Sequence, residues 1–214
     1  QATGPVTLAA ALRAGGVTGP DLVVRVVDEL LVRIERHVSW VREESGAKRV
    51  VLVLDEPALA ALGASQTTLP DSVRRSLSRL ITDLDVEVGI HCCGDTDWGG
   101  LAELGFDWLS LDLSALGEGF LNGVEAVAMA LARGTRMMWG IVPTTAGPLP
   151  DTNVLIGRYG TAVANLVVAG APFEMLKAQA WFTPACGLAG LSVGAAEAVT
   201  NRLDEVVEEV ESGW

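Results

Sequence analysis

The fold of this chain is decided by the stretch Val86-Glu87-Val88-Gly89-Ile90-His91-Cys92-Cys93-Gly94-Asp95. Its apolar first half has the character of a buried strand, which breaks at Gly94 directly after one histidine and two cysteines. Because alternate side chains of a strand point to opposite faces, His91 and Cys93 share one face and Cys92 points to the other, into the core. An imidazole and a thiol are therefore expected to face a common point where a strand meets a loop.

Two further strand-like runs end next to a residue that can bind a metal. The run at 106–111 is followed by Asp112, and the run at 177–182 is followed after three residues by Cys186. Zinc takes three or four ligands of nitrogen, sulfur or carboxylate type, so two groups alone would not form a site. If the strands are parallel neighbours, their carboxyl ends lie on one rim of the sheet, and the sequence predicts that four side chains converge there: His91, Cys93, Asp112 and Cys186.

Strands and helices alternate along the whole chain, which predicts the α/β class with a parallel sheet. The segment RVVLVLD at 49–55 lacks polar alternation, as expected for a strand covered on both faces. Apolar residues recur at three- and four-residue steps from Asp21 to about Glu44, which predicts an amphipathic helix that Gly46 ends. Further strands are expected around His91 and at 106–112, 136–142 and 177–182, and further helices at 7–13, 71–84, 98–104, 120–133, 152–169 and 193–211.

An open doubly wound sheet and a closed barrel both satisfy this alternation. No GxGxxG or Walker motif follows a strand, so a dinucleotide or phosphate site is not indicated. Polar residues at nearly every strand end favour a (βα)8 TIM-type barrel, whose active site draws on many strand ends. Five full strands and the tail of a sixth are recognisable. We therefore expect a barrel that lacks its first strands in this chain, which opens on Gln1 and is expected to belong to a longer polypeptide.

Composition limits the possible partners. The 214 residues are 50% hydrophobic with a mean hydropathy of +0.37, enough for one domain over 1–214. Fifteen basic against twenty-seven acidic residues give a net charge of −12, which argues against nucleic acid or an anionic membrane. No signal peptide or bilayer-spanning run is visible, so a cytoplasmic location is expected. Three cysteines, two of them adjacent, favour reduced thiols or metal binding over disulfides.

Five ordered motifs resemble the cobalamin-independent methionine synthase family, in the later part of its C-terminal catalytic barrel, within the methionine synthase and uroporphyrinogen decarboxylase-like superfamily. The similarity runs over essentially the whole chain. The motifs are Thr3-Gly4-Pro5-Val6-Thr7, Leu54-Asp55-Glu56-Pro57-Ala58-Leu59, His91-x-Cys93, Asp107-x-x-Ser110-x-Asp112 and Pro184-x-Cys186-Gly187-Leu188.

The resemblance implies a zinc ion held by His91, Cys93, Asp112 and Cys186, with Asp112 one methylene shorter than the glutamate of the family. It also implies that Asp55 holds the amino group of homocysteine. The chain departs from the family in two places: Val142-Pro143-Thr144-Thr145 replaces a segment that is usually Asp-x-His, and Ala189-Gly190-Leu191 replaces a Lys-Thr-Arg segment.

By this resemblance the protein would be a methyltransferase that transfers a methyl group, in the family from 5-methyltetrahydropteroyltriglutamate, to the thiol of homocysteine, giving methionine. Its partners would be a small-molecule thiol and a methyl donor, with a homodimer or an association with a missing N-terminal segment to complete the barrel. Two alternatives stay open: a degenerate or truncated barrel without catalysis, and a metal-free decarboxylase-like barrel. A buried cysteine and a satisfied histidine would also explain His91 and Cys93 taken alone, and Asp55 and Glu56 could each simply cap the following turn.

Overall fold

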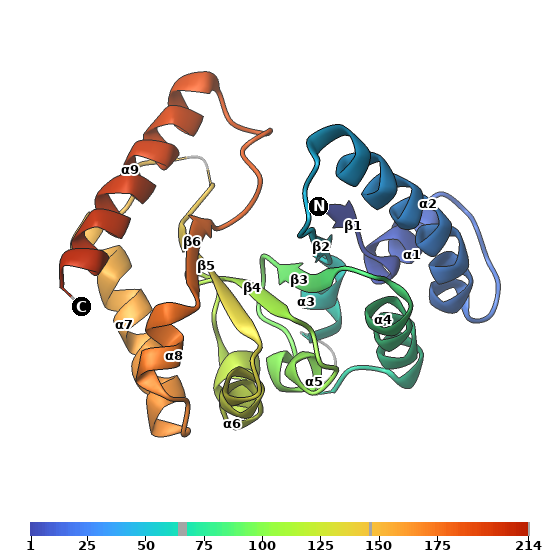
Figure 1. The fold of residues 1–214 in the computed structure, drawn as a ribbon, viewed down its shortest axis with the longest axis horizontal. Helices are drawn as coiled ribbons and strands as arrows, with labels where there is room; N and C mark the ends of the chain where they lie inside the picture. The colour runs from blue at the N-terminus through green and yellow to red at the C-terminus, as the bar shows by residue number, and fades with distance from the viewer. Residues whose placement is uncertain (64–67, 146, 214) are drawn as a thin grey trace.

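The structure is a computed structural model in which residues 1–63, 68–145 and 147–213 are described (Figure 1). Their strands form one parallel sheet in which every strand pairs with its neighbours in the chain. The order is β1 (Ala2–Thr3), β2 (Val51–Asp55), β3 (Glu87–Cys92), β4 (Trp108–Asp112), β5 (Arg136–Val142) and β6 (Ala180–Pro184).

The helices follow the strands in alternation. Helix α2 shows why the sequence folds this way: a stripe of buried apolar residues faces the core, and Gly46 ends the helix with a positive φ of 65°. The helices are α1 (Pro5–Ala14), α2 (Leu22–Ser45), α3 (Ala58–Gly63), α4 (Asp71–Asp83), α5 (Trp98–Ala102), α6 (Glu118–Ala132), α7 (Thr152–Val168), α8 (Phe173–Ala178) and α9 (Val193–Ser212).

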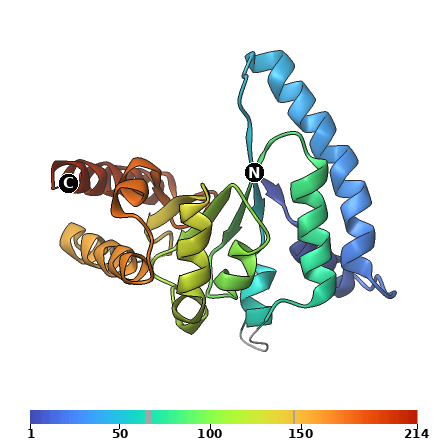
Figure 2. The ribbon, with the colours of Figure 1, turned by 60° about the horizontal axis from the view of Figure 1, so that its bottom comes forward.

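The strand order is that of a (βα) barrel and not that of a doubly wound sheet. A doubly wound sheet reverses its strand order at a switch point, whereas the order here runs from β1 to β6 without reversal. In Figure 1 the helices surround a curved sheet, with α1, α2 and α4 on one flank, α5 and α6 below, and α7, α8 and α9 on the other flank. Figure 2 shows α2 and α4 running side by side. The described residues thus form a six-stranded part of a barrel, with β1 and β6 at its edges.

The sheet has an apolar layer on each of its faces. Between the sheet and the helices lies the main core, which includes Leu54, Ile90, Leu109 and Trp139. The opposite face of the same strands carries a smaller cluster of Val53, Trp108 and Met138. Successive residues of a strand, such as Val53 and Leu54, point to opposite faces of the sheet, and both faces are apolar because both are covered.

Gly89 makes room for Trp108 on the inner face of the sheet. A Cβ at position 89 would lie 2.9 Å from the Cβ of Trp108 and 3.4 Å from Cγ2 of Val53. The indole is 1% exposed, and its Nε1 donates to Glu87 Oε2 over 2.8 Å. Gly89 therefore has a packing role on β3.

Two basic side chains join Glu87 at the amino ends of the strands. Arg49 donates to both carboxylate oxygens, with 2.8 Å from its Nη2 to Oε2, and Arg136 donates to Oε2 over 3.0 Å. Both guanidinium groups also lie over the ring of Trp108, at 5.8 Å and 4.7 Å from its centroid. The inner face of the sheet therefore carries its cations at the end opposite to His91.

The structure corrects two sequence-based expectations. The last strand begins at Ala180 and not at Lys177, because residues 173–178 form α8, which starts after Pro172 and buries Leu176. Helix α3 was not expected at all. Both misses concern helices of six residues, which are too short for periodicity to distinguish a helix from a strand.

Among the described helices, none combines the length and the hydropathy that crossing a bilayer would require.

Candidate metal centre

The end of β3 separates its two adjacent cysteines. Cys92 is completely buried in the core under the helices, and burial raises its pKa to about 11, so it stays a neutral thiol. Cys93 is half-buried on the other side of the chain. The expectation that Cys92 is a core residue is confirmed, and Cys93 is left as the thiol that can take part in chemistry.

Three metal-ligating side chains meet at the carboxyl ends of the strands. One ligand atom each from His91, Cys93 and Cys186 lies within 4.8 Å of the other two. His91 and Cys93 belong to β3 and its end, whereas Cys186 follows β6, three strands further along the sheet. In a flat sheet such strands are about 14 Å apart, so the curvature of the barrel brings these residues together.

The imidazole of His91 is held from one side and free on the other. Its Nδ1 lies 3.1 Å from Oγ of Ser110 on the neighbouring strand β4. Its Nε2 is buried and has no hydrogen-bond partner among the described residues. The tautomer with the proton on Nδ1 satisfies both observations, because Nδ1–H then donates to Ser110 and Nε2 offers its lone pair.

The electrostatic surroundings keep this imidazole neutral. Burial lowers the pKa of His91, and the nearby carboxylates of Asp55 and Asp112 oppose this effect only in part. Burial raises the pKa of the Cys93 thiol, and Cys186 and Asp112 raise it further. Among the described residues, a buried nitrogen without a hydrogen-bond partner lies in a group with two thiols, and a cation would satisfy this arrangement.

The donor set fits zinc. One imidazole nitrogen and two sulfurs are ligands that zinc prefers, and in a tetrahedral site they lie about 3.5–3.8 Å from one another. The three donors, which are within 4.8 Å of each other, would have to approach by about 1 Å. Rotation of the two cysteine side chains can move their sulfur atoms by that distance while the strands stay in place.

Asp112 lies beside this group without being part of it. It ends β4, and its Oδ1 accepts hydrogen bonds from the backbone nitrogen of Ser114 at 2.7 Å and from its hydroxyl at 2.6 Å. Among the described residues, the set of mutually close ligand atoms contains the histidine and the two cysteines but not this carboxylate. The structure thus brings together three of the four predicted ligands and places the fourth next to them.

Asp55 also reaches the same end of the sheet. It is the last residue of β2, it is in register with His91 on β3, and it is half-buried. Its charge raises the pKa of His91 against the effect of burial, so the two groups are electrostatic neighbours.

Glu56 has a role that the sequence did not indicate. It is completely buried, and its carboxylate accepts hydrogen bonds from Val6 N at 2.8 Å, from Thr7 N at 2.7 Å and from Thr7 Oγ1 at 2.7 Å. It therefore caps α1, nearly fifty residues away, and not the turn that follows it. A possible signal is that α1 begins with Gly4-Pro5, which offers no capping side chain of its own.

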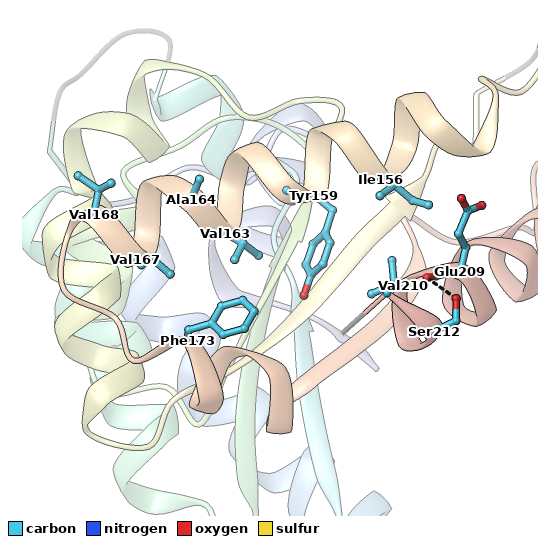
Figure 3. A pocket seen from close by; sticks show the side chains of 12 residues that line it. Ile156, Tyr159, Val163, Ala164, Val167, Val168, Phe173, Glu209, Val210 and Ser212 are labelled. Atoms are coloured by element: carbon cyan, nitrogen blue, oxygen red, sulfur yellow. Dashed lines mark hydrogen bonds between the residues drawn. The ribbon is translucent and has the colours of Figure 1, made fainter.

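A hollow of about 800 Å³ lies away from these residues, between α7, α8 and α9 (Figure 3). Its walls are mainly apolar, with Val163 and Phe173 on one side and Val210 on the other. Tyr159 stands between them, and its ring packs edge-on against Trp139 and Phe182 with centroid distances of 5.2 Å each. This hollow lies in the helical layer and takes no part in the candidate metal centre.

No protein-family model matches the chain. A protein of Methanothermobacter marburgensis named methionine synthase is 26% identical over 208 residues, which are 96% of this chain and 60% of that protein. The chain is similar to a methionine synthase. It spans less than two thirds of the length of that relative. Among solved structures, Yersinia pestis DHPS with a pterine-sulfa conjugate matches with a TM-score of 0.43 and 16% identity, over 74% of this chain and 66% of that one. The second match is too distant to carry an argument.

Proposed function

We propose that residues 1–214 are one domain, the later part of the barrel of a zinc-dependent methyltransferase that transfers a methyl group to a thiol. Homocysteine is the expected acceptor, and methionine the expected product. One observation carries the proposal: a ring nitrogen of His91, whose Nε2 is buried and has no hydrogen-bond partner among the described residues, lies within 4.8 Å of the thiols of Cys93 and Cys186 at the carboxyl ends of the strands. The similarity to a methionine synthase supports the same chemistry.

Four residues would hold the metal in this proposal. His91, Cys93 and Cys186 form the group already assembled, and Asp112 would leave its turn with Ser114 to complete it. With Zn²⁺ bound, two thiolates and one carboxylate would give the site as a whole a formal charge of −1. A bound zinc ion makes the thiolate form of an acceptor available at neutral pH.

The remaining chemistry is a direct displacement. The acceptor sulfur attacks the methyl carbon of the donor in line, the new S–C bond forms, and the electron pair of the breaking bond goes to the leaving group. No protein nucleophile is required, so the side chains have to bind and orient. Asp55 would hold the ammonium group of an amino-acid acceptor through a charge-assisted hydrogen bond.

The test compares two cysteines that are adjacent in sequence but face opposite sides of β3. Purified protein is loaded with zinc, and homocysteine methylation is followed with methyl iodide, a donor that needs no binding site. We expect the wild type and Cys92→Ala to bind about one zinc per chain and to accelerate methylation, and Cys93→Ala to lose both properties. If Cys93→Ala binds zinc and reacts like the wild type, the proposal is wrong, and a barrel without zinc chemistry explains the fold better.

A further inference from the structure

Two of the three cysteines face each other at the candidate metal centre. The Sγ atoms of Cys93 and Cys186 lie within 4.8 Å of each other, although the two residues are far apart in the sequence. The S–S bond of a disulfide is about 2.05 Å long, and a change of one χ1 rotamer moves a cysteine sulfur by about 3 Å. Rotation of the side chains can therefore bring these two sulfurs to bonding distance when no metal lies between them.

The backbone next to each cysteine is held in place by packing. Ala185, directly before Cys186, is buried, and its backbone nitrogen donates to the carbonyl oxygen of the last residue of β5 over 2.8 Å. Gly94, directly after Cys93, packs against α3 so closely that a Cβ on it would lie 2.6 Å from the Cβ of Ala60. The short distance between the two thiols therefore follows from the fold, because a buried or closely packed neighbour anchors each of them.

The two thiols differ in their exposure. Cys186 is exposed and Cys93 is half-buried, so a small oxidant in solution reaches the sulfur of Cys186 first. The segment after Cys186 has room to adjust when a bond forms, since a Cβ added at Gly187 or Gly190 would meet nothing within 4 Å. Cys186 is thus placed to be oxidised, and Cys93 is placed to react with the oxidised sulfur.

Cys92 is kept out of this chemistry, although it is the neighbour of Cys93 in the sequence. It is 0% exposed, and its side chain belongs to the core between the sheet and the helices. Among the described residues, the group of mutually close ligand atoms contains Cys93 and Cys186 but not Cys92. Three cysteines allow three pairings, and the structure favours the one between Cys93 and Cys186.

We propose that a peroxide joins Cys93 and Cys186 in a reversible disulfide, and that this bond prevents zinc from binding. The inference rests on the proposed function and adds a regulation of the same site. Zinc binds cysteine in the thiolate form, and the sulfurs of a disulfide have no thiolate to offer. Oxidation therefore removes two ligands in one step, and reduction of the disulfide restores both.

The oxidation is balanced with hydrogen peroxide as the oxidant. The sulfur of Cys186 attacks one peroxide oxygen, the O–O bond breaks, and the thiol proton leaves with the other oxygen as water, so that a sulfenic acid remains. The sulfur of Cys93 then attacks the sulfenic sulfur, the S–S bond forms, and the sulfenic oxygen leaves as a second water molecule. Two molecules of a small thiol such as glutathione reverse the step by thiol–disulfide exchange and become a disulfide themselves.

The first experiment exposes chelator-treated and zinc-loaded protein to hydrogen peroxide. Thiol titration counts the free cysteines, and peptide mapping by mass spectrometry identifies the pair that has formed. We expect the chelator-treated protein to fall from three free thiols per chain to one, which is Cys92, and the zinc-loaded protein to keep all three over the same time. A disulfide that includes Cys92, a disulfide between two chains, or equal loss of thiols in both samples would contradict the inference.

The second experiment measures zinc uptake by the oxidised protein. We expect uptake to be lost after oxidation and to return to about one zinc per chain after treatment with dithiothreitol. Cys92→Ala should show the same loss and recovery, whereas Cys186→Ala should form no disulfide within the chain. Oxidised protein that binds zinc as well as reduced protein does would overturn this inference alone. Reduced protein that binds no zinc would instead overturn the proposed function.

Discussion

At the scale of single residues, the site depends on a histidine fixed by a neighbour. Ser110 Oγ lies 3.1 Å from Nδ1 of His91, which leaves Nε2, unpartnered among the described residues, as the nitrogen available to a metal. Groups that hold a metal-ligating histidine in place by a hydrogen bond commonly alter metal affinity by about 10–100-fold. The sequence placed Ser110 in a motif but gave it no role, because the pairing of His91 with Ser110 is a register between two strands that a linear pattern does not reveal.

Replacing Ser110 should therefore weaken metal binding. We expect Ser110→Ala to lower zinc affinity about tenfold, since the ring loses its fixed tautomer and orientation. Ser110→Thr keeps the hydroxyl and should restore most of the affinity. Competition with a chromophoric chelator measures both, and an unchanged affinity in Ser110→Ala would show that the hydroxyl does not position the ring.

Glu56 provides a prediction about stability. Its carboxylate accepts three hydrogen bonds from residues 6 and 7, and an amide in its place would turn an NH₂ group toward one of these donors. Glu56→Gln should lower the free energy of unfolding by about 1–3 kcal/mol in urea denaturation. The exposed Glu208 serves as the control position, where the same change to glutamine should alter stability little.

The same residue sets a pH dependence. Burial raises the pKa of Glu56 above its ordinary value of 4.5, so the folded protein binds more protons than the unfolded chain between 4.5 and the raised pKa. Stability contributed by this group is then complete below the unfolded pKa and declines as the pH rises through the folded pKa. The advantage of the wild type over Glu56→Gln should be greatest near pH 4.5 and smaller at pH 8. An advantage that grows with pH would mean that the hydrogen bonds outweigh burial.

At the scale of elements, the sequence predicted the long helices and the buried strands well. Helix α2 and strand β5 lie within a residue or two of the expected bounds, because their periodicity is unambiguous over enough residues. The short helices α3 and α8 were missed, since six residues carry too little pattern. The role of Gly89 was also missed, because the side chain for which it makes room, Trp108, belongs to another strand.

A pair of glycine substitutions tests the packing of β3 on β4. Gly89→Ala would place a methyl group 2.9 Å from the Cβ of Trp108, so we expect a loss of about 1–3 kcal/mol in unfolding free energy. Gly157 lies in α7 with nothing within 4 Å of its potential Cβ, and Gly157→Ala should be neutral or stabilise by up to about 1 kcal/mol. Equal effects of the two changes would contradict the tight contact.

At the scale of the whole molecule, the curved sheet is what produces the site. The sequence placed His91, Cys93 and Cys186 at strand ends, and the parallel order of the strands brings those ends to one side. The bonding of Asp112 to Ser114 was not predictable, because it depends on the local turn after β4. A metal bound by these residues would link β3 to the loop after β6, across the sheet.

Metal binding should therefore stabilise the whole domain. We expect the zinc-loaded protein to unfold at a higher temperature than protein treated with a chelator, because the metal binds the folded chain more tightly than the unfolded one. Cys186→Ser should lose most of this difference, and Cys92→Ala should keep it. Calorimetry with and without added zinc measures the effect, and a Tm that zinc does not change would indicate that β3 and β6 are not linked.

The central claim is that a metal joins His91, Cys93 and Cys186, and X-ray absorption at the zinc edge tests it most directly. The account predicts about one zinc per chain with two sulfur neighbours at about 2.3 Å, and one sulfur neighbour in Cys186→Ser. Protein that takes up no zinc, or a zinc environment with the same sulfur count in the wild type and the variant, would contradict the account.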